Sequence, residues 1–330
     1  MAALPDRYAD SPPRGALLDL RDLQPEHLAP LLVEEIEAWR SRLDWDFRMS
    51  ADLVKRFVQV RALNGFALLE GGVRNTAVAG YCYYVAEEGK GLIGDFYVRE
   101  SARTVENENR LLEAVLESMW RTPGMRRVEA QMLMLSSHLN RPMPFPRWCR
   151  MFQRGFFEVN GLTAGTLPAR EPAGATILPW AVNMSEEAAR LIAISYQGHV
   201  DSQINDQYRS PAGAVRFLAN IVKFPGCGQF FGPASFAARD RNSGALCGIS
   251  LASMVAPDVG HITQLCVAPS HQGRGVGYEL LRRSLDSLAA HGCRGASLTV
   301  TIANQIAIRL YESVGFRDRR DFAAFVWELG

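Results

Sequence analysis

The spacing of apolar residues in the second half of the chain predicts a layered α/β domain. Residues 278–290 carry leucines at helical spacing, and Gly292 ends this predicted helix. Residues 296–302 instead alternate between apolar and polar side chains, as a strand does when one of its faces is buried. The full order that we predict is strand 176–181, helix 185–196, helix 211–222, strands 235–238, 245–254 and 260–267, helix 278–290, strand 296–302, helix 304–313 and strand 322–329.

A similar pattern occurs about 168 residues earlier, which indicates an internal repeat. Residues 95–119 align without a gap with residues 264–288, and both segments predict a strand, a turn and an amphipathic helix. Residues 150–156 align with residues 309–316 when one gap is allowed. We therefore predict that the chain contains two copies of one fold.

Length and composition agree with two ordinary globular domains. The chain has 330 residues, about twice a domain of ~150 residues, so we expect the copies at residues 1–165 and 166–330. Residues 162–175 are rich in Gly, Pro and Ala, as a linker is. The 36 basic residues balance 35 acidic ones to a net charge of +1, which argues against binding to nucleic acid or to an anionic membrane surface.

Nothing in the sequence suggests a membrane span, secretion or a metal site. Apolar runs stay below the ~18–20 residues of a membrane helix, and the first residues include prolines and acids where a signal peptide is apolar. The six cysteines show no metal-ligand spacing. We therefore expect a cytoplasmic protein with reduced core thiols and no metal.

A glycine-rich loop between a predicted strand and a predicted helix is the main chemical signal. It consists of Gln272, Gly273, Arg274, Gly275, Val276 and Gly277. Backbone N–H groups at the start of a helix suit a pyrophosphate, and Arg274 would add positive charge. A plain tight turn is the alternative interpretation, because the spacing matches neither a Rossmann nor a Walker loop.

Two motifs together resemble the GNAT (general N-acetyltransferase) superfamily. The loop fits the family's form Q/R-x-x-G-x-G/A through Gln272, Gly275 and Gly277. About 30 residues later, the form N-x-x-A-x-x-x-Y-x-x-x-G-F is matched by Asn304, Ala307, Tyr311, Gly315 and Phe316. The resemblance implies an α/β fold of two tandem GNAT-like domains, each a mixed, mostly antiparallel sheet flanked by helices.

The resemblance also implies acetyl-CoA as the acyl donor and assigns roles to residues of the second half. The main chain of Leu265, Cys266 and Val267 would pair with the pantetheine arm, and the loop 272–277 would hold the pyrophosphate. Asn304 would hydrogen-bond the donor or simply cap its helix. Tyr311 would protonate the departing sulfur, or would only pack on the sheet.

His261 is the leading candidate for the general base, and a polar stretch of the second half offers alternatives. His261 occupies the strand position where several GNAT enzymes carry a glutamate, and a histidine titrates near neutral pH. The alternatives are His199, Asp201 and Asp206. They lie in a polar stretch that often lines the acceptor site in this family. In the same stretch, Tyr208 and Arg209 would recognise the acceptor. His271, beside the glycine loop, is expected at the surface.

The first copy is expected not to bind acyl-CoA. In the alignment, Glu106 and Glu108 stand where the second copy has Gly275 and Gly277, so two negative side chains would oppose a pyrophosphate. Phe152 stands in place of Tyr311 in the same alignment. A structural role follows for this copy, with the Pro-rich residues 138–148 as a surface loop or a cover over a site.

We therefore predict an N-acyltransferase that moves acetyl from acetyl-CoA to a primary amine of a small molecule by direct attack in a ternary complex. The alternatives are acetylation of a protein N-terminus or lysine, a tandem synthase of a thiol cofactor of the mycothiol kind, and a non-catalytic acyl-CoA-binding or assembly module. A monomer or homodimer is expected. The sequence leaves the acceptor and the acyl chain length open.

Overall fold

A computed structural model describes residues 16–70, 77–87, 89–135, 141–223, 226 and 228–329. The chain forms two compact units, and both are built from more than one segment. The first unit comprises Met1–Ala38, Ala51–Arg150 and Val326–Gly330, and the second comprises Trp39–Ser50 and Met151–Phe325. These units do not divide at residues 165/166, because each of them includes segments from both sides of that boundary. The predicted boundary concerns the repeat and stays a prediction.

The first unit is a sheet with helices. Its strands follow the order β1-β2-β3-β4-β5, and the last residues of β13 lie beside β5. Its elements are β1 (Leu17–Asp19), α1 (Pro25–Leu43, whose last turn belongs to the second unit), α2 (Arg48–Gln59, whose first residues do), β2 (Asn64–Leu69), β3 (Val78–Glu87), β4 (Lys90–Val98), α3 (Val105–Trp120) and β5 (Arg127–Met132).

The second unit is also a mixed sheet flanked by helices. Its strand order is β13-β6-β12-β11-β10-β9-β7, with β8 beside β10. Its elements are β6 (Cys149–Asn160), β7 (Ala175–Pro179), α4 (Ser185–Ser195), α5 (Asp201–Ile204), α6 (Pro211–Lys223), β8 (Gln229–Phe230), β9 (Phe236–Asp240), β10 (Leu246–Ala256), β11 (Val259–Val267), α7 (Val276–Ala290), β12 (Gly295–Thr301), α8 (Gln305–Ser313) and β13 (Arg317–Glu328).

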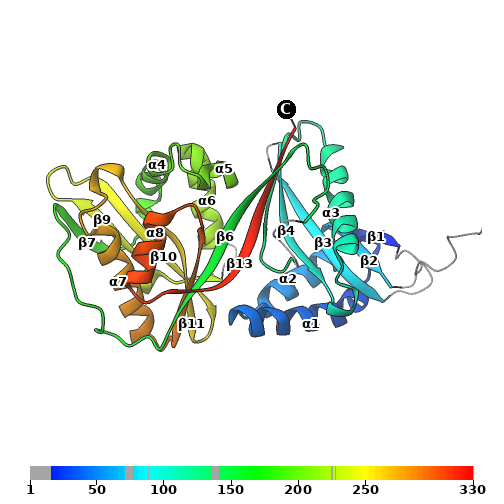
Figure 1. The fold of residues 1–330 in the computed structure, drawn as a ribbon, viewed down its shortest axis with the longest axis horizontal. Helices are drawn as coiled ribbons and strands as arrows, with labels where there is room; N and C mark the ends of the chain where they lie inside the picture. The colour runs from blue at the N-terminus through cyan, green and yellow to red at the C-terminus, as the bar shows by residue number, and fades with distance from the viewer. Residues whose placement is uncertain are drawn as a thin grey trace, which may run out of the picture. The chain divides into compact units, whose positions relative to one another are not determined.

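The predicted order of elements in the second half is thus confirmed, and α5 and β8 are additions. Helices α4 and α6 pack an apolar face against one side of the sheet, with Ile249 and Leu251 of β10 in that core. Helices α7 and α8 cover the other side, where Leu281 and Leu285 pack on Leu298 of β12. Figure 1 shows α7 and α8 in orange tones and α4 and α6 in green.

Strand pairing repeats almost residue for residue in the two units. In the first, β3 and β4 pair from Gly80/Val98, with a register shift after Tyr83/Asp95. In the second, β10 and β11 pair from Gly248/Val267, with a register shift after Leu251/Gln264. A β-bulge therefore occupies the same place in both sheets, which supports two copies of one fold.

One part of the predicted alignment is wrong. Residues 150–156 were matched to a segment that includes helix α8, yet Phe152 lies inside strand β6. Phe152 therefore does not occupy the place of Tyr311. Among the described residues between β5 and β6, the first unit has no counterpart of α8; part of the Pro-rich stretch 138–148 lies outside them.

Candidate active site

The second unit has an open strand edge in the middle of its sheet. Parallel strands β11 and β12 pair from Val259/Gly295 to Ile262/Leu298, and the pairing stops there although both strands continue. Within the described residues, no strand pairs with β11 on that side between Thr263 and Val267. Main-chain groups of this edge can therefore bond a ligand as they would bond a strand.

A cavity of about 370 Å³ lies at this open edge. It is lined by Ser195, Tyr196, His199, Leu265, Cys266, Val267, His271, Gln272, Gly273, Gly275, Gly277, Tyr278, Asn304, Ile306, Ala307, Leu310 and Tyr311. The structure thus brings together most of the predicted site residues from β11, the glycine loop and α8.

The glycine loop turns into helix α7 beside the cavity. Gly273 and Gly275 have φ angles of +73° and +80°, a left-handed conformation that side chains disfavour. Gly275 directly precedes the helix at Val276. The side-chain amide of Gln272 donates to the carbonyl of Val267 at 3.3 Å, which ties the loop to the strand. The helix N-terminus and its free N–H groups therefore form a place for an anion.

Two predicted loop residues do not line the cavity. Arg274 is exposed, and its side chain is not part of the cavity wall. Val276 is 1% exposed and packs in the core with Leu280. The Val276 side chain is therefore not available to a ligand at the loop.

Helix α8 contributes the other wall of the cavity. The side-chain oxygen of Asn304 accepts a hydrogen bond from the N–H of Ala307 at 3.2 Å, so Asn304 caps the helix as well as lining the cavity. Tyr311 is 8% exposed. Burial raises the pKa of the Tyr311 phenol above its usual value, and the charge of Asp201 adds to this shift. The phenol is therefore protonated at neutral pH.

His261 lies away from the cavity. It is 4% exposed, and its Nδ1 is 2.9 Å from the hydroxyl oxygen of Ser297. The ring of Trp45 packs edge-on at 5.0 Å between centroids. Burial, with a smaller contribution from the charge of Arg154, lowers the pKa of His261 to about 3. His261 is thus a neutral, covered side chain.

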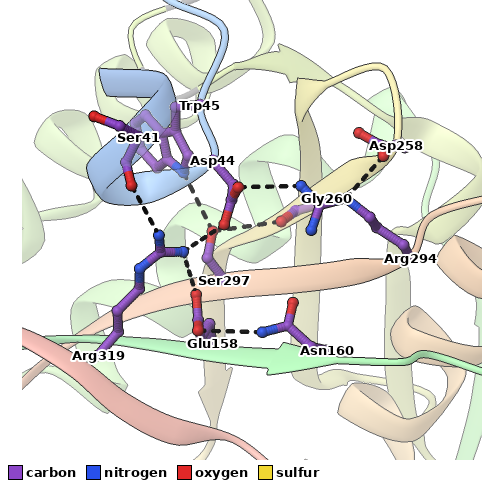
Figure 2. A network of polar contacts seen from close by, with 10 residues as sticks. All are labelled: Ser41, Asp44, Trp45, Glu158, Asn160, Asp258, Gly260, Arg294, Ser297 and Arg319. Atoms are coloured by element: carbon purple, nitrogen blue, oxygen red, sulfur yellow. Dashed lines mark hydrogen bonds and ion pairs between the residues drawn. The ribbon is translucent and has the colours of Figure 1, made fainter. Parts of the chain in front are cut away.

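A polar network holds Trp45 over this part of the sheet. The indole N–H of Trp45 donates to the Ser297 hydroxyl at 3.4 Å. The neighbouring Asp44 carboxylate accepts hydrogen bonds from Arg294, at 3.1 Å, and from Arg319. Figure 2 shows these contacts converging on the segment that follows α1. This segment therefore forms part of the second unit and separates His261 from solvent.

The polar stretch after α4 contributes His199 to the cavity and places the charge of Asp201 near Tyr311. His199 lines the cavity, and its Nδ1 accepts a hydrogen bond from the N–H of Asp201 at 3.1 Å. The Asp201 carboxylate accepts a hydrogen bond from the Thr301 hydroxyl. Neither Asp201 nor Asp206 lines the cavity, and the Arg209 side chain donates to the carbonyl of Ser202 at 2.7 Å.

Several lining residues were missed from the sequence. Tyr196 ends α4, Tyr278 lies in the first turns of α7, and Ile306 is 72% exposed at the start of α8. His271 was expected at the surface, yet it lines the cavity and bonds the Asp240 carboxylate at 2.8 Å. Tyr278, Ile306 and His271 lie within or next to the motifs, which could have indicated them, whereas Tyr196 has no motif beside it.

The matching loop of the first unit is filled by its own side chains. Glu108 has no exposed surface, and its carboxylate pairs with the Arg141 guanidinium at 2.5 Å. Arg141 also donates to the Asn109 side chain at 2.5 Å. Thr104 caps helix α3 by accepting from the N–H of Asn107 at 3.2 Å. The start of α3 is therefore already occupied.

Two properties of the described part of the chain bear on the site. No group of three or more His, Cys, Asp or Glu side chains there could hold a metal ion. No helix among those residues is long and apolar enough to cross a membrane.

Comparison with known proteins assigns the class. Residues 204–316, which include β11, the glycine loop and α8, match the family described as "Acetyltransferase (GNAT) family". This part of the chain is similar to that family, and the fold of the chain is that of GNAT proteins, tandem ones included.

Individual curated proteins are similar to part of the chain. A mycothiol acetyltransferase from Acidimicrobium ferrooxidans is 35% identical over 105 residues, which cover 31% of this chain and 34% of that protein. The aligned segments cover about a third of the curated relatives' length.

Two solved structures share the fold. A GCN5-related N-acetyltransferase from Sphaerobacter thermophilus has a TM-score of 0.66 and 17% identity, covering 99% of this chain and 97% of that one. A tandem GNAT protein from the clavulanic acid biosynthesis pathway has a TM-score of 0.54 and 16% identity, covering 82% and 83%.

Proposed function

We propose that the second unit transfers acetyl from acetyl-CoA to a primary amine of a small molecule by direct attack in a ternary complex. The observation that carries this proposal is the cavity at the open edge of β11, which has a glycine turn at a helix N-terminus on one side and the buried phenol of Tyr311 on another. A phosphate-bearing acyl donor fits these features.

The residues present fit acetyl-CoA in three places. The open edge of β11 would pair with the pantetheine arm through the main chain of Leu265, Cys266 and Val267. The loop 272–277 would hold the pyrophosphate, and the Asn304 amide would contact the arm. When bound, acetyl-CoA supplies an acetyl group activated as a thioester.

Tyr311 is proposed as the general acid. The new C–N bond forms as the C–S bond breaks, and the phenol gives its proton to the departing sulfur. Direct transfer is favoured because burial raises the pKa of the Cys266 thiol to about 12, so the cavity wall offers no thiolate to carry an acyl group.

Asp201 is the better candidate for the base, although His261 was the leading one. The amine must lose a proton, which balances the proton taken by sulfur. His261 is covered by Trp45 and has a pKa of about 3, so it binds a proton poorly at neutral pH. The Asp201 carboxylate raises the pKa of Tyr311 and lies 3.7 Å from the Nδ1 of His199, which lines the cavity. We therefore propose that Asp201 takes the proton, directly or through water.

The first unit is proposed to have no donor site. The pair Glu108–Arg141 fills the start of α3, and a buried ion pair is costly to break because each charge would be left without its partner. The first unit would then shape or support the second.

For the acceptor, we propose only a chemical class, a primary amine of a small molecule. Similarity to the mycothiol acetyltransferase from Acidimicrobium would extend the acceptor to the amine of a thiol-cofactor precursor. Acetylation of a protein N-terminus or lysine and a non-catalytic acyl-CoA-binding module are the other candidates. A buried proton donor at the cavity favours an enzyme over a binding module.

The substitution Tyr311→Phe tests the assigned chemistry. Because it removes only the phenol oxygen, kcat should fall by roughly 10²-fold while the Kd for acetyl-CoA changes by less than about threefold. Stopped assays of thiol release and calorimetric titration measure the two quantities. An unchanged kcat would remove Tyr311 from the acid role.

A further inference from the structure

The wall of the cavity opposite the glycine loop bears on which acyl groups can fit. The loop follows β11 after Val267, whereas Gln264 lies three residues earlier, about 10 Å back along the strand at ~3.3 Å per residue. The Gln264 side-chain amide donates to the Tyr196 hydroxyl at 3.0 Å. Tyr196 therefore lines the end of the cavity that lies away from the loop.

Tyr196 also lies close to the proposed reaction centre. Besides burial, the groups of Cys266, Asp201 and Tyr311 raise the pKa of the Tyr196 phenol, and Asp201 and Cys266 raise that of Tyr311, which places these side chains in one neighbourhood. Tyr196 and Tyr311 both line the cavity. An acyl chain whose carbonyl carbon lies beside Tyr311 would meet Tyr196 as it lengthens.

The ring of Tyr196 is held from three directions. Besides its bond to Gln264, it stacks on Tyr208 with 4.4 Å between ring centroids and an angle of 25°. The His199 ring packs against it edge-on at 5.2 Å. Tyr208 is in turn fixed by Phe217 at 4.8 Å. Moving Tyr196 aside would break the hydrogen bond and the stack together, so this wall is rigid.

From this geometry we infer that Tyr196 is a specificity-determining residue that restricts the donor to acyl groups of about two carbons. This inference rests on the proposed function. Forcing extra methylenes against this packed wall is unfavourable, so each additional methylene lowers affinity for the acyl-CoA. The ring provides the barrier, and the hydroxyl serves only to hold it.

The test uses the full chain and measures calorimetric Kd values for acetyl-CoA and butyryl-CoA, which require no knowledge of the acceptor. Wild-type protein should bind acetyl-CoA at least about tenfold more tightly than butyryl-CoA. Tyr196→Ala should narrow this ratio to within about threefold, and Tyr196→Leu, which preserves apolar packing, should narrow it partly. Tyr196→Phe is the matched control and should keep the wild-type ratio, because the ring remains.

Equal binding of the two donors by wild-type protein would overturn the inference, as would an unchanged ratio in both Tyr196→Ala and Tyr196→Leu. Either result leaves the proposed function intact. If wild-type protein binds neither acyl-CoA, the proposed function fails, and this inference fails with it. The two failures are therefore distinguishable.

Discussion

Burial decides what two side chains of the second unit can do with a proton. Tyr311 is a weak acid, so burial keeps its phenol protonated beside the cavity. His261 is a base, so burial keeps its imidazole neutral, and Trp45 covers it. The same physical cause thus suits Tyr311 to donate a proton and makes His261 unsuited to accept one.

Substitutions at Asp201 and His261 should separate the two candidate bases. Asp201→Asn removes the proton acceptor with little change in shape and should lower kcat by roughly 10²-fold. His261→Gln should leave the shape of the pH–rate profile between pH 5.5 and 8 unchanged, because a histidine with a pKa of about 3 does not titrate there. Initial rates across that range provide the comparison. If His261→Gln removes a titrating limb, the base assignment returns to His261.

The positions of site residues at the cavity were predictable only where a motif defines them. Tyr311 and Asn304 belong to a spaced pattern and both line the cavity. His261 was chosen by its position on a strand, and no local pattern shows that Trp45, distant in the sequence, packs on it. Contacts between remote segments are what the single sequence lacks.

Asp95 of the first unit should give stability an unusual pH dependence. The Tyr81 hydroxyl lies 2.8 Å from the Glu35 carboxylate and 2.6 Å from that of Asp95, and both Glu35 and Tyr81 have no exposed surface. Burial raises the pKa of Asp95 from 3.8 to about 6. Folded protein therefore holds a proton that unfolded protein releases, so this group makes the free energy of unfolding fall as pH rises from about 4 to about 6.

Asp95→Asn should remove this contribution. The amide keeps a hydrogen-bonding shape without a charge, so at pH 7.5 we expect a gain of roughly 1 kcal/mol, or about 2–4 °C in Tm. Asp19→Asn is the control and should lower Tm at pH 7.5, because Arg21 lowers the pKa of Asp19 and so stabilises its ionised form in the folded protein. Thermal unfolding at several pH values measures both. A lower Tm for Asp95→Asn at pH 7.5 would contradict the assignment.

At the scale of elements, the turn into α7 depends on a glycine in a left-handed conformation. Gly275→Ala should destabilise the protein by roughly 1–2 kcal/mol and, by moving the N–H groups of the helix start, raise the Kd for acetyl-CoA by roughly tenfold. Gly244 has a φ of +70° in the turn between β9 and β10, with open space around it. Gly244→Ala should therefore cost similar stability without changing the Kd. Equal Kd values for the two variants would show that the loop does not hold the donor.

Elements were predicted well where periodicity was strong, as in α7, which was expected at residues 278–290 and spans Val276–Ala290. The segment around Phe152 was not, because its match to α8 relied on residue identities while the segment itself forms the long strand β6. Short identities cannot distinguish a helix from a strand when the period of the pattern is ignored.

At the scale of the molecule, each unit uses chain from the other half. Trp39–Ser50 belongs to the second unit, and Val326–Gly330 belongs to the first. This exchange could not be predicted, because a strand's partner is set by long-range pairing that leaves no local pattern. The repeat itself was predictable, since both copies keep the same bulge and the same strand pairing.

The two copies should differ in ligand binding. Because Glu108 and Arg141 fill the loop of the first unit, titration of the whole chain with acetyl-CoA should give one site per chain. Isothermal titration calorimetry reports this number directly. Two sites per chain would show that the first unit also binds the donor.

We propose that the chain is an amine acetyltransferase, and thiol release from acetyl-CoA across a panel of primary amines tests this proposal most directly. The panel should include free amino acids, thiol-cofactor precursors and peptides, with Tyr311→Phe measured in parallel. We predict amine-dependent thiol release that falls by roughly 10²-fold in Tyr311→Phe. Binding of acetyl-CoA without thiol release for any amine would contradict the claim and identify a binding module instead.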